Sequence, residues 1–116
     1  MSHVYEMRMY FVTPGKMDAL IARFADHTDA LFARYGIKTV GYWTPRENPK
    51  NLLLYILEHD SVEAAEKNWA AFRADKDWQR IRAETDTPVP LVSSMDCYFM
   101  DKIDFSKLKT RVSSKT

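Results

Sequence analysis

The sequence predicts an α+β domain in which four strands and two main helices follow one another in the order βαββαβ. Three observations support this prediction. Four segments look like strands, because they either alternate apolar and polar residues or are rich in β-branched and apolar residues. Two longer segments repeat apolar residues every three or four positions, as amphipathic helices do. Gly, Pro, Asn and Asp separate these segments. The elements and turns of one small domain account for the chain, which has 116 residues and no internal repeat.

Residues 4–12 form the first predicted strand, and its two sides differ in character. The apolar side is Tyr5, Met7, Met9 and Phe11, and the polar side is Glu6, Arg8 and Tyr10. This period of two indicates a strand with one side in a core. Thr13 is expected to cap the helix that follows, with Pro14 at its first position.

The first helix is predicted from Met17 to Tyr35, and Gly36 is expected to end it in a left-handed conformation. Its apolar stripe is Met17, Leu20, Ile21, Phe24, Thr28, Leu31 and Tyr35. Residues 37–44 and 52–59 then read as strands, and the polar turn between them predicts an antiparallel hairpin. Residues 52–57 are apolar on both faces, which favours a place in the middle of the sheet.

The second helix is predicted to begin after Asp60 and Ser61. Its apolar stripe is Val62, Ala65, Trp69 and Phe72. Asp75 is expected to cap a short additional helix with Trp78 and Ile81. Residues 87–90 break the chain, and residues 91–100 form the last predicted strand.

This order is the ferredoxin-like arrangement, a four-stranded antiparallel sheet with two main helices on one face. The other face would carry part of residues 52–57 with Tyr10, Tyr55 or Trp43, which is too apolar for water. We therefore expect a homodimer in which two copies pair as a dimeric α/β barrel. We expect this domain to span residues 1–105 and a basic C-terminal tail to span residues 106–116.

The charge and the cysteine content indicate which kinds of partner and which cellular compartment to expect. The formal net charge of +1 gives no field for nucleic acid, and the basic tail reads as a frayed terminus rather than a nucleic-acid arm. No apolar run approaches the length of a membrane span. Cys97 has no partner for an intrachain disulfide and is expected to be a structural thiol, so a reducing, cytoplasmic location is expected.

Several segments, taken in order, resemble the NIPSNAP family. The first is the strand at residues 5–10, Tyr-Glu-Met-Arg-Met-Tyr, which runs into Pro-Gly-Lys at residues 14–16. The resemblance continues through Gly36-Ile37, the Val-Gly-Tyr-Trp-Thr strand at residues 40–44, Asn51, Asp60-Ser61, and Asp75 with Trp78. The resemblance covers residues 4 to about 101. It rests on the ordered set of these segments, because no single segment is specific to the family.

The resemblance implies a place in the dimeric α/β-barrel group. That group includes cofactor-free monooxygenases, haem-degrading enzymes and small isomerases or cyclases, and kinship of fold does not choose among them. The chain is expected to be one bare domain without a leader or a tandem copy. The mitochondrial or vesicular roles of larger family members are therefore not carried over.

Glu6, Arg8 and Tyr10 are the first candidate site residues. Arg8 could hold a carboxylate or an enolate, and Tyr10 could donate a proton or a hydrogen bond. The alternative, which the residues favour, is that Glu6 and Arg8 pair with each other or with a neighbouring strand and organise the inner face of the dimer.

Three further residues are weaker ligand-binding candidates. His27 could act as a general base over a pocket, although an exposed position or the edge of a core is the commoner role. His59 more often makes a hydrogen bond at a strand-to-helix turn, and Trp43 is more often core than ligand wall. The scattered His residues predict no metal site. With only three Gly residues and no glycine-rich phosphate loop, no cofactor is expected.

Two functions therefore remain open. The first is a homodimeric barrel that binds a small apolar or aromatic molecule between sheet and helices, with Arg8, Tyr10 and Trp43 near the ligand. Its chemistry, where it has any, would be cofactor-independent oxygenation or isomerisation. The second is a non-enzymatic protein-interaction module. A cavity that receives Arg8 or His27 would favour the first.

Overall fold

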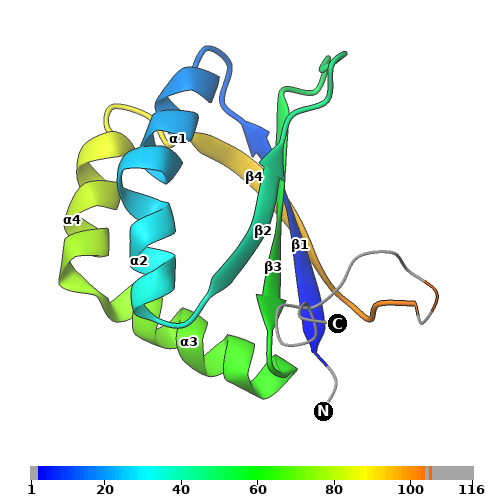
Figure 1. Ribbon diagram of the computed structural model, residues 1–116. Helices are drawn as coiled ribbons and strands as arrows, with labels where there is room; N and C mark the ends of the chain where they lie inside the picture. Colours follow the sequence, from blue (N-terminus) through cyan, green and yellow to red (C-terminus); the bar gives the residue numbers. More distant parts are fainter. Residues whose placement is uncertain (1–2, 104, 106–116) are drawn as a thin grey trace.

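A four-stranded antiparallel sheet with helices along one side forms the fold, as the computed structural model of residues 3–103 and 105 shows (Figure 1). Its strands are β1 (Val4–Val12), β2 (Lys38–Trp43), β3 (Leu52–His59) and β4 (Val92–Met100). Its helices are α1 (Met17–Arg23), η1 (Phe24–Thr28), α2 (Asp29–Arg34), α3 (Val62–Ala74) and α4 (Lys76–Thr85). The strand order β2-β3-β1-β4 confirms the predicted ferredoxin-like arrangement.

The two inner strands, β1 and β3, bring the polar side of β1 beside the most buried strand. Arg8 pairs with Tyr55 and Tyr10 with Leu53 across the β1–β3 ladder, and Arg8 pairs with Cys97 of β4 on the other side. β3 is internal, as its apolar content on both faces predicted. The β2–β3 hairpin is antiparallel, as expected from the polar turn between these strands.

The first long helix contains a π-helical turn that the sequence did not predict. Residues 17–34 form α1, η1 and α2 in direct succession, and the amide of Asp29 bonds to the carbonyl of Phe24, five residues back. The helix ends at Gly36, whose φ of 76° confirms the predicted left-handed residue. A π turn keeps the general helical pattern and adds one residue to it, so apolar periodicity alone does not reveal it.

The beginning of that helix corrects the predicted cap. The Thr13 hydroxyl does not cap α1 but donates to the carbonyl of Pro90, 2.6 Å away. Pro14 and Gly15 form a turn closed by a hydrogen bond from the Lys16 amide to the Thr13 carbonyl, and the helix begins at Met17. The left-handed Gly15, with φ of 80°, makes this turn possible and delays the helix.

The two other predicted caps are confirmed. The Ser61 side chain accepts the Ala64 amide at 2.9 Å at the start of α3, and the Asp75 carboxylate accepts the Trp78 amide at 2.8 Å at the start of α4. Both residues are extended, the backbone state from which a side-chain oxygen reaches the first turn of a helix.

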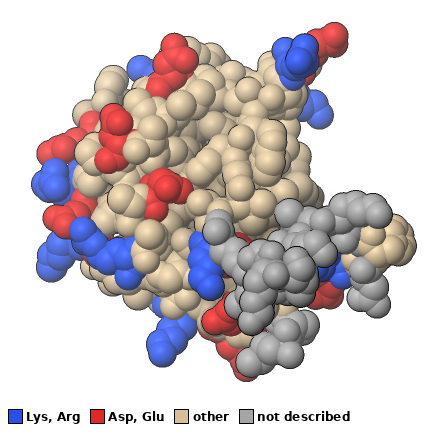
Figure 2. Space-filling model, in the orientation of Figure 1, with Lys and Arg blue, Asp and Glu red and all other residues tan. Residues whose placement is uncertain are grey.

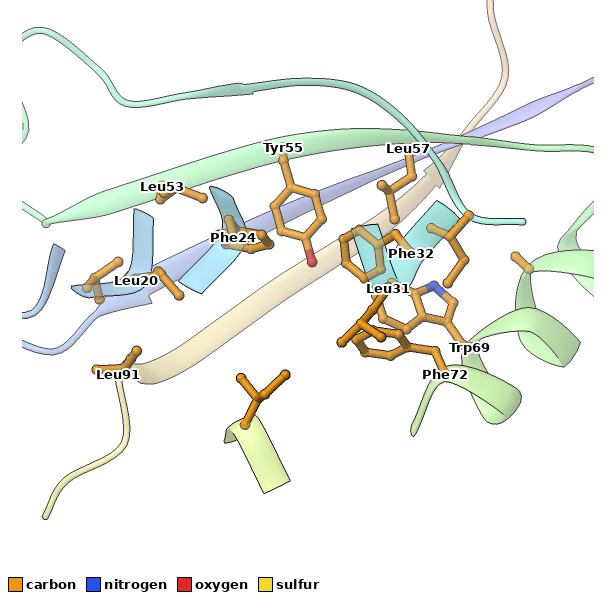
Figure 3. Close-up of a cluster of buried hydrophobic side chains, with 14 residues drawn as sticks. Leu20, Phe24, Leu31, Phe32, Leu53, Tyr55, Leu57, Trp69, Phe72 and Leu91 are labelled. Atoms are coloured by element: carbon orange, nitrogen blue, oxygen red, sulfur yellow. The ribbon is translucent and has the colours of Figure 1, made fainter. Parts of the chain in front are cut away.

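The main core lies between the sheet and the helices (Figure 3). Tyr55 extends from β3 between Phe24 and Phe32, and it is fully buried. Its ring centroid lies 5.0 Å from that of Phe24 and 6.1 Å from that of Phe32. Tyr10 belongs to the same layer, since its ring packs against those of Phe24 and Tyr55. The expectation that Tyr10 and Tyr55 could lie on the bare face of the sheet is therefore wrong.

The opposite face of the sheet carries a continuous set of apolar side chains, which we call the open face. It consists of Met7, Met9, Phe11, Trp43, Leu52, Leu54, Ile56 and Tyr98, as the strand pairing shows. Trp43 and Tyr98 are about half exposed. The apolar side of β1 thus faces away from the helices, and its polar side faces toward them. Trp43 lies on this face, as the sequence analysis expected for it as one of three possible residues.

The predicted basic tail, residues 106–116, lies outside the described residues, so the domain boundary at residue 105 stays a prediction. None of the helices in the described part of the chain is long and apolar enough to cross a membrane. Cys97 is a free, exposed thiol on β4.

Candidate functional site

A cavity of about 370 Å³ opens between the β1–β4 half of the sheet and the helices. From the sheet, Arg8, Tyr10, Val92, Ser93, Ser94 and Met95 line it. From the helices and the segment before β4, its walls are Arg23, Phe24, Thr28, Phe32, Trp69, Phe72, Arg73, Trp78, Arg82, Asp86 and Pro90. The volume and the aromatic content are those of a small-molecule pocket.

The buried carboxylate of Glu6 organises the polar groups behind the cavity. It accepts the Trp69 indole N–H at 2.9 Å and Arg8 Nη1 at 2.8 Å, and it lies 2.8 Å from His59 Nε2. Burial raises the pKa of Glu6, but the hydrogen bonds from His59, Trp69 and Arg8 outweigh it, so the pKa is lowered overall. Glu6 is therefore a charged group at neutral pH, fixed by three partners from β1, β3 and α3.

Arg8 is held in one orientation by its neighbours. Its Nε donates to the Tyr55 hydroxyl at 2.9 Å, and its guanidinium carbon lies 4.3 Å from the centroid of the Trp69 ring. Burial disfavours the charge, but Tyr55, Tyr10 and Glu6 outweigh it and raise the pKa of Arg8. The remaining nitrogen, Nη2, has only long contacts, 3.4 Å to the Tyr10 hydroxyl and 3.5 Å to Met95 Sδ. Arg8 is thus a permanent cation with spare donor capacity toward the cavity.

The two tyrosine hydroxyls form a short chain that ends in the cavity. Tyr10 and Tyr55 share a hydrogen bond of 2.7 Å, and Tyr55 also accepts from Arg8. Because Tyr55 is fully buried, its own proton needs an acceptor, and the Tyr10 oxygen is the one that the described contacts provide. The Tyr10 proton is then free for a ligand. Burial raises the pKa of Tyr55 strongly, so this hydroxyl stays protonated at neutral pH.

Arg23 and Asp86 close the far wall of the cavity. Arg23 Nη1 lies 3.0 Å from Asp86 Oδ1 and 3.0 Å from the Thr85 hydroxyl, and its guanidinium packs on the Trp78 ring. The Asp86 carboxylate also accepts the Leu91 amide at 3.1 Å. Burial raises the pKa of Asp86, and the Leu91 amide and Arg23 outweigh it and lower the pKa overall. This ion pair joins the first long helix to the segment before β4.

A second cavity, of about 280 Å³, lies on the other side of Phe24 and is lined by Ile21, Phe24, Ala25, Asp29, Tyr42 and Leu53. Its polar contact is the Tyr42 hydroxyl, which donates to Asp29 at 2.7 Å. Burial and the Asp29 carboxylate raise the pKa of Tyr42, so it is a neutral phenol. Figure 2 shows few charged side chains on this side of the molecule, between the helices and the β2–β3 connection. Phe24, from the π-helical turn, separates the two cavities.

The structure brings together four of the six predicted site residues. Arg8 and Tyr10 line the cavity, Glu6 lies directly behind them, and buried His59 contacts Glu6 from the end of β3. His59 Nδ1 has no partner within the described part of the chain. The ion pair between Glu6 and Arg8 confirms the pairing that the favoured alternative expected. The other part of that alternative, a role of the pair in organising the inner face of a dimer, stays a prediction.

The other two candidates lie elsewhere. His27 is exposed on η1 and lines neither cavity. Trp43 is on the open face, the opposite side of the sheet from Arg8 and Tyr10, so the expectation that these three residues share a ligand is wrong. The physical reason is parity. Trp43 pairs with Leu54 on β3, whereas Arg8 pairs with Tyr55, and adjacent residues of a strand face opposite sides.

Sequence reasoning missed Thr28 and the arginines of the helix layer as cavity residues. It also missed Tyr55 as the hydrogen-bond partner of Arg8 and Tyr10. Tyr55 lay inside an apolar strand and Thr28 within a helical stripe, so both were assigned to packing. Arg23 was off the predicted stripe, yet it is buried against Asp86. The one available signal was the polar side of β1, because three polar side chains on an inner strand require partners on the facing helices.

Among residues 3–103 and 105, no group of three or more His, Cys, Asp or Glu is placed to hold a metal ion. The cavity presents guanidinium and hydroxyl groups, which are donors to anionic or oxygen-bearing molecules.

Comparison with known proteins identifies the family of this chain. A model of the family described as NIPSNAP matches residues 5–107. A NIPSNAP family protein from Agrobacterium tumefaciens has a similar structure, with a TM-score of 0.81, 20% identity, and coverage of 92% of this chain and 99% of that one. A NIPSNAP-like domain protein from Burkholderia xenovorans has a TM-score of 0.80, 19% identity, and coverage of 90% and 89%.

A more distant structure is that of a Bordetella bronchiseptica protein named as a candidate antibiotic biosynthesis monooxygenase. Its TM-score is 0.66 at 16% identity, and the match covers 89% of this chain and 99% of that one. At such identity the likeness shows a common fold. No curated protein sequence matches this chain.

Proposed function

This chain belongs to the NIPSNAP family, and from that premise we propose that it is a homodimeric barrel that binds a small, largely apolar molecule between its sheet and its helices. The observation that carries the proposal is the cavity beside β1 and β4, with Arg8 and Tyr10 on its sheet side. Most ligand sites combine an apolar wall with a few convergent polar groups, and this cavity has both.

The apolar wall consists of aromatic side chains from three helical segments. Phe24 and Phe32 come from the first long helix, Trp69 and Phe72 from α3, and Trp78 from α4. Rings of this kind offer large contact areas with little rotational freedom to lose, so they suit a flat or apolar ligand. The polar groups at the sheet side would then set its orientation.

The groups beside the ligand suit a reaction in which negative charge develops on oxygen. Arg8 is a permanent cation, and the Tyr10 hydroxyl has a proton available for an oxyanion or enolate. Cofactor-independent oxygenation and isomerisation both pass through such species. We propose one of these as the reaction class, with Arg8 and Tyr10 as the groups that would stabilise the charge. The distant likeness to a candidate antibiotic biosynthesis monooxygenase is consistent with it.

The open face supports the proposed dimer. Its eight apolar side chains come from all four strands, and an apolar patch of this extent on a sheet normally meets a partner. A second copy that presents the same face would bury both patches around a two-fold axis. The alternative function is an interaction module that binds a different protein there. Trp43 and Tyr98, which are about half exposed on this face, would be among the contacts of such a partner.

Native mass spectrometry of the protein purified from its own host tests the proposal. We expect a dimer mass with a small adduct that is released on denaturation. The Tyr10→Phe variant should retain less adduct, because it removes the free hydroxyl donor. Tyr5→Phe is the matched control, since Tyr5 is on the same strand but on the other face and its hydroxyl has no partner among the described residues. A clean dimer without adduct would favour the interaction module, and a monomer would contradict the barrel.

A further inference from the structure

The cavity beside β1 and β4 has more positive than negative charge around it. Arg8, Arg23, Arg73 and Arg82 line it, whereas Asp86 is the one carboxylate in the described lining and Glu6 lies behind Arg8. Four guanidinium groups against two carboxylates leave an excess of two positive charges in a site walled by aromatic rings. Such an excess favours an anionic ligand, because low-dielectric walls strengthen the attraction.

The arginines divide into two kinds. Arg23 is buried and bound to Asp86 and Thr85, and Arg82 lies 3.3 Å from Asp86, so these two share one carboxylate. Arg73, on α3, is exposed, and its side chain forms no hydrogen bond or ion pair with the residues that the structure describes. Arg8 is bound through Nε and Nη1 but has only long contacts at Nη2. Arg8 and Arg73 therefore have capacity for an anion.

A buried hydroxyl gives an independent sign of a ligand. Thr28 lines the cavity and is 3% exposed, and its hydroxyl is buried without a hydrogen-bond partner among the described residues. Buried polar atoms in folded proteins are nearly always paired, with protein, water or ligand. Thr28 is the last residue of the π-helical turn η1, a feature that often occurs at functional sites. Its hydroxyl is therefore a donor for which the described residues provide no acceptor.

We propose that the cavity takes an organic anion, a carboxylate attached to an aromatic or similarly flat apolar body. The carboxylate binds Arg8 through Nη2, the Thr28 hydroxyl adds a second hydrogen bond, and Arg73 at the surface attracts the anion as it enters. The apolar body lies against Trp69, Phe72 and Trp78. This inference rests on the proposed function, because it names the ligand class of the same cavity.

The test compares two probes of the same shape that differ in charge, naphthalene-2-carboxylate and naphthalene-2-carboxamide. Binding is followed by the indole N–H signals of the ¹⁵N-labelled protein in NMR spectra. Trp69 and Trp78 line the cavity, whereas Trp43 on the open face serves as an internal control. We expect the carboxylate to shift the signals of Trp69 and Trp78, and to bind at least about tenfold more tightly than the carboxamide.

Two conservative variants separate the contributions. Thr28→Val keeps the shape of the side chain and should weaken the carboxylate about three- to tenfold. Arg73→Gln should weaken the carboxylate but not the carboxamide, and the loss should shrink at high salt. Arg80→Gln is the control, because Arg80 is an exposed arginine of α4 that pairs with Asp77 and Glu84 outside the cavity. It should leave both affinities unchanged.

The possible failures are distinguishable. Equal affinities for the two probes, with shifts at Trp69 and Trp78, would overturn the anion preference and leave the small-molecule barrel standing. Shifts confined to Trp43, or no binding of either probe at millimolar concentration, would overturn this inference and also count against the proposed function. Unchanged carboxylate affinity in both Thr28→Val and Arg73→Gln would refute the assigned contacts.

Discussion

At the scale of single residues, Glu6 is the side chain on which the site depends most. It is buried on an inner strand and binds Arg8, Trp69 and His59, each from a different direction. The charge on Glu6 compensates that of Arg8, and the fixed carboxylate holds the Trp69 ring against the guanidinium. Glu6 therefore positions two residues of the cavity wall without lining the cavity itself.

Replacing Glu6 by Gln should destabilise the protein by about 3–5 kcal/mol, because a buried guanidinium would lose its counter-charge. Urea denaturation of the wild type and the variant measures the difference. Glu84→Gln is a suitable control, since Glu84 forms an exposed pair with Arg80 and its loss should cost at most about 0.5 kcal/mol. Similar costs for the two variants would show that Arg8 finds another partner.

The hydroxyl groups of Tyr10 and Thr28 illustrate how much a site depends on a few atoms. Both residue types are common in cores, and neither is part of a sequence motif that names a reaction. The Thr28 hydroxyl has no partner among the described residues, whereas the Tyr10 hydroxyl bonds to Tyr55 and, when it accepts that bond, keeps its own proton for a ligand. Both proposed roles depend on the packing of distant segments.

At the scale of elements, Asp75 joins the end of the first long helix to the beginning of α4. Its carboxylate accepts the Trp78 amide as a cap, and it also binds the Tyr35 hydroxyl and Arg34. These hydrogen bonds, that from Tyr35 foremost, lower the pKa of Asp75 to about 2. Since α3 and α4 carry the aromatic wall of the cavity, this junction fixes the wall relative to α2.

The lowered pKa predicts how stability depends on pH. The charged carboxylate is favoured in the folded state, so its stabilising effect is full above about pH 4 and is lost as the pH falls toward 2. In Asp75→Asn the cap is retained but the charge is absent. The difference in unfolding free energy between wild type and variant should therefore shrink across this range, as acid-dependent denaturation curves would show.

The neighbouring Asp77 provides the control for that experiment. It also contacts Arg34, but both side chains are more than half exposed. Asp77→Asn should keep the acid dependence of the wild type. If Asp75→Asn shows the same slope as the wild type between pH 4 and 2, the Asp75 carboxylate is not the group responsible.

The strand β1 shows why the type of an element was easier to predict than which of its sides faces the helices. Its alternation correctly predicted a strand at Val4–Val12, yet the helices cover the side with Glu6, Arg8 and Tyr10. The usual rule places the apolar side of a strand toward the helices. Here the polar side is satisfied by hydrogen bonds within the core, and the apolar side is left for the open face.

At the scale of the whole molecule, the open face is the surface through which we propose that two copies pair. Its residues lie on the side of the sheet away from the described helices (Figure 1). Two copies joined through it would place the two cavities on the outer sides of the paired sheets, each within its own protomer.

A charge at the centre of the open face should prevent the proposed dimer. Leu54→Glu would bring two carboxylates into an apolar interface, so we expect sedimentation velocity to show a monomer at micromolar concentration. Val62→Glu is the matched control, because Val62 is exposed on α3, away from that face. A wild-type monomer, or a Leu54→Glu dimer, would contradict the assignment of the interface.

The sequence by itself determined the element order, the ferredoxin-like fold, the left-handed Gly36 and the caps at Ser61 and Asp75. It also identified Arg8 and Tyr10, because polar side chains on an inner strand are conspicuous in the pattern alone. The elements and caps depend on interactions between residues close together in the chain, and their spacing is visible in the sequence. The ferredoxin-like arrangement was inferred from the order of these elements.

Only the tertiary structure decided which face of the sheet the helices cover, that Trp43 lies on the opposite face of the sheet from Arg8, and that Thr28 and Arg73 belong to one cavity. Each depends on the packing of segments far apart in the chain. Local periodicity does not reveal such contacts, because the same alternation of apolar and polar residues is compatible with burial of either face of a strand.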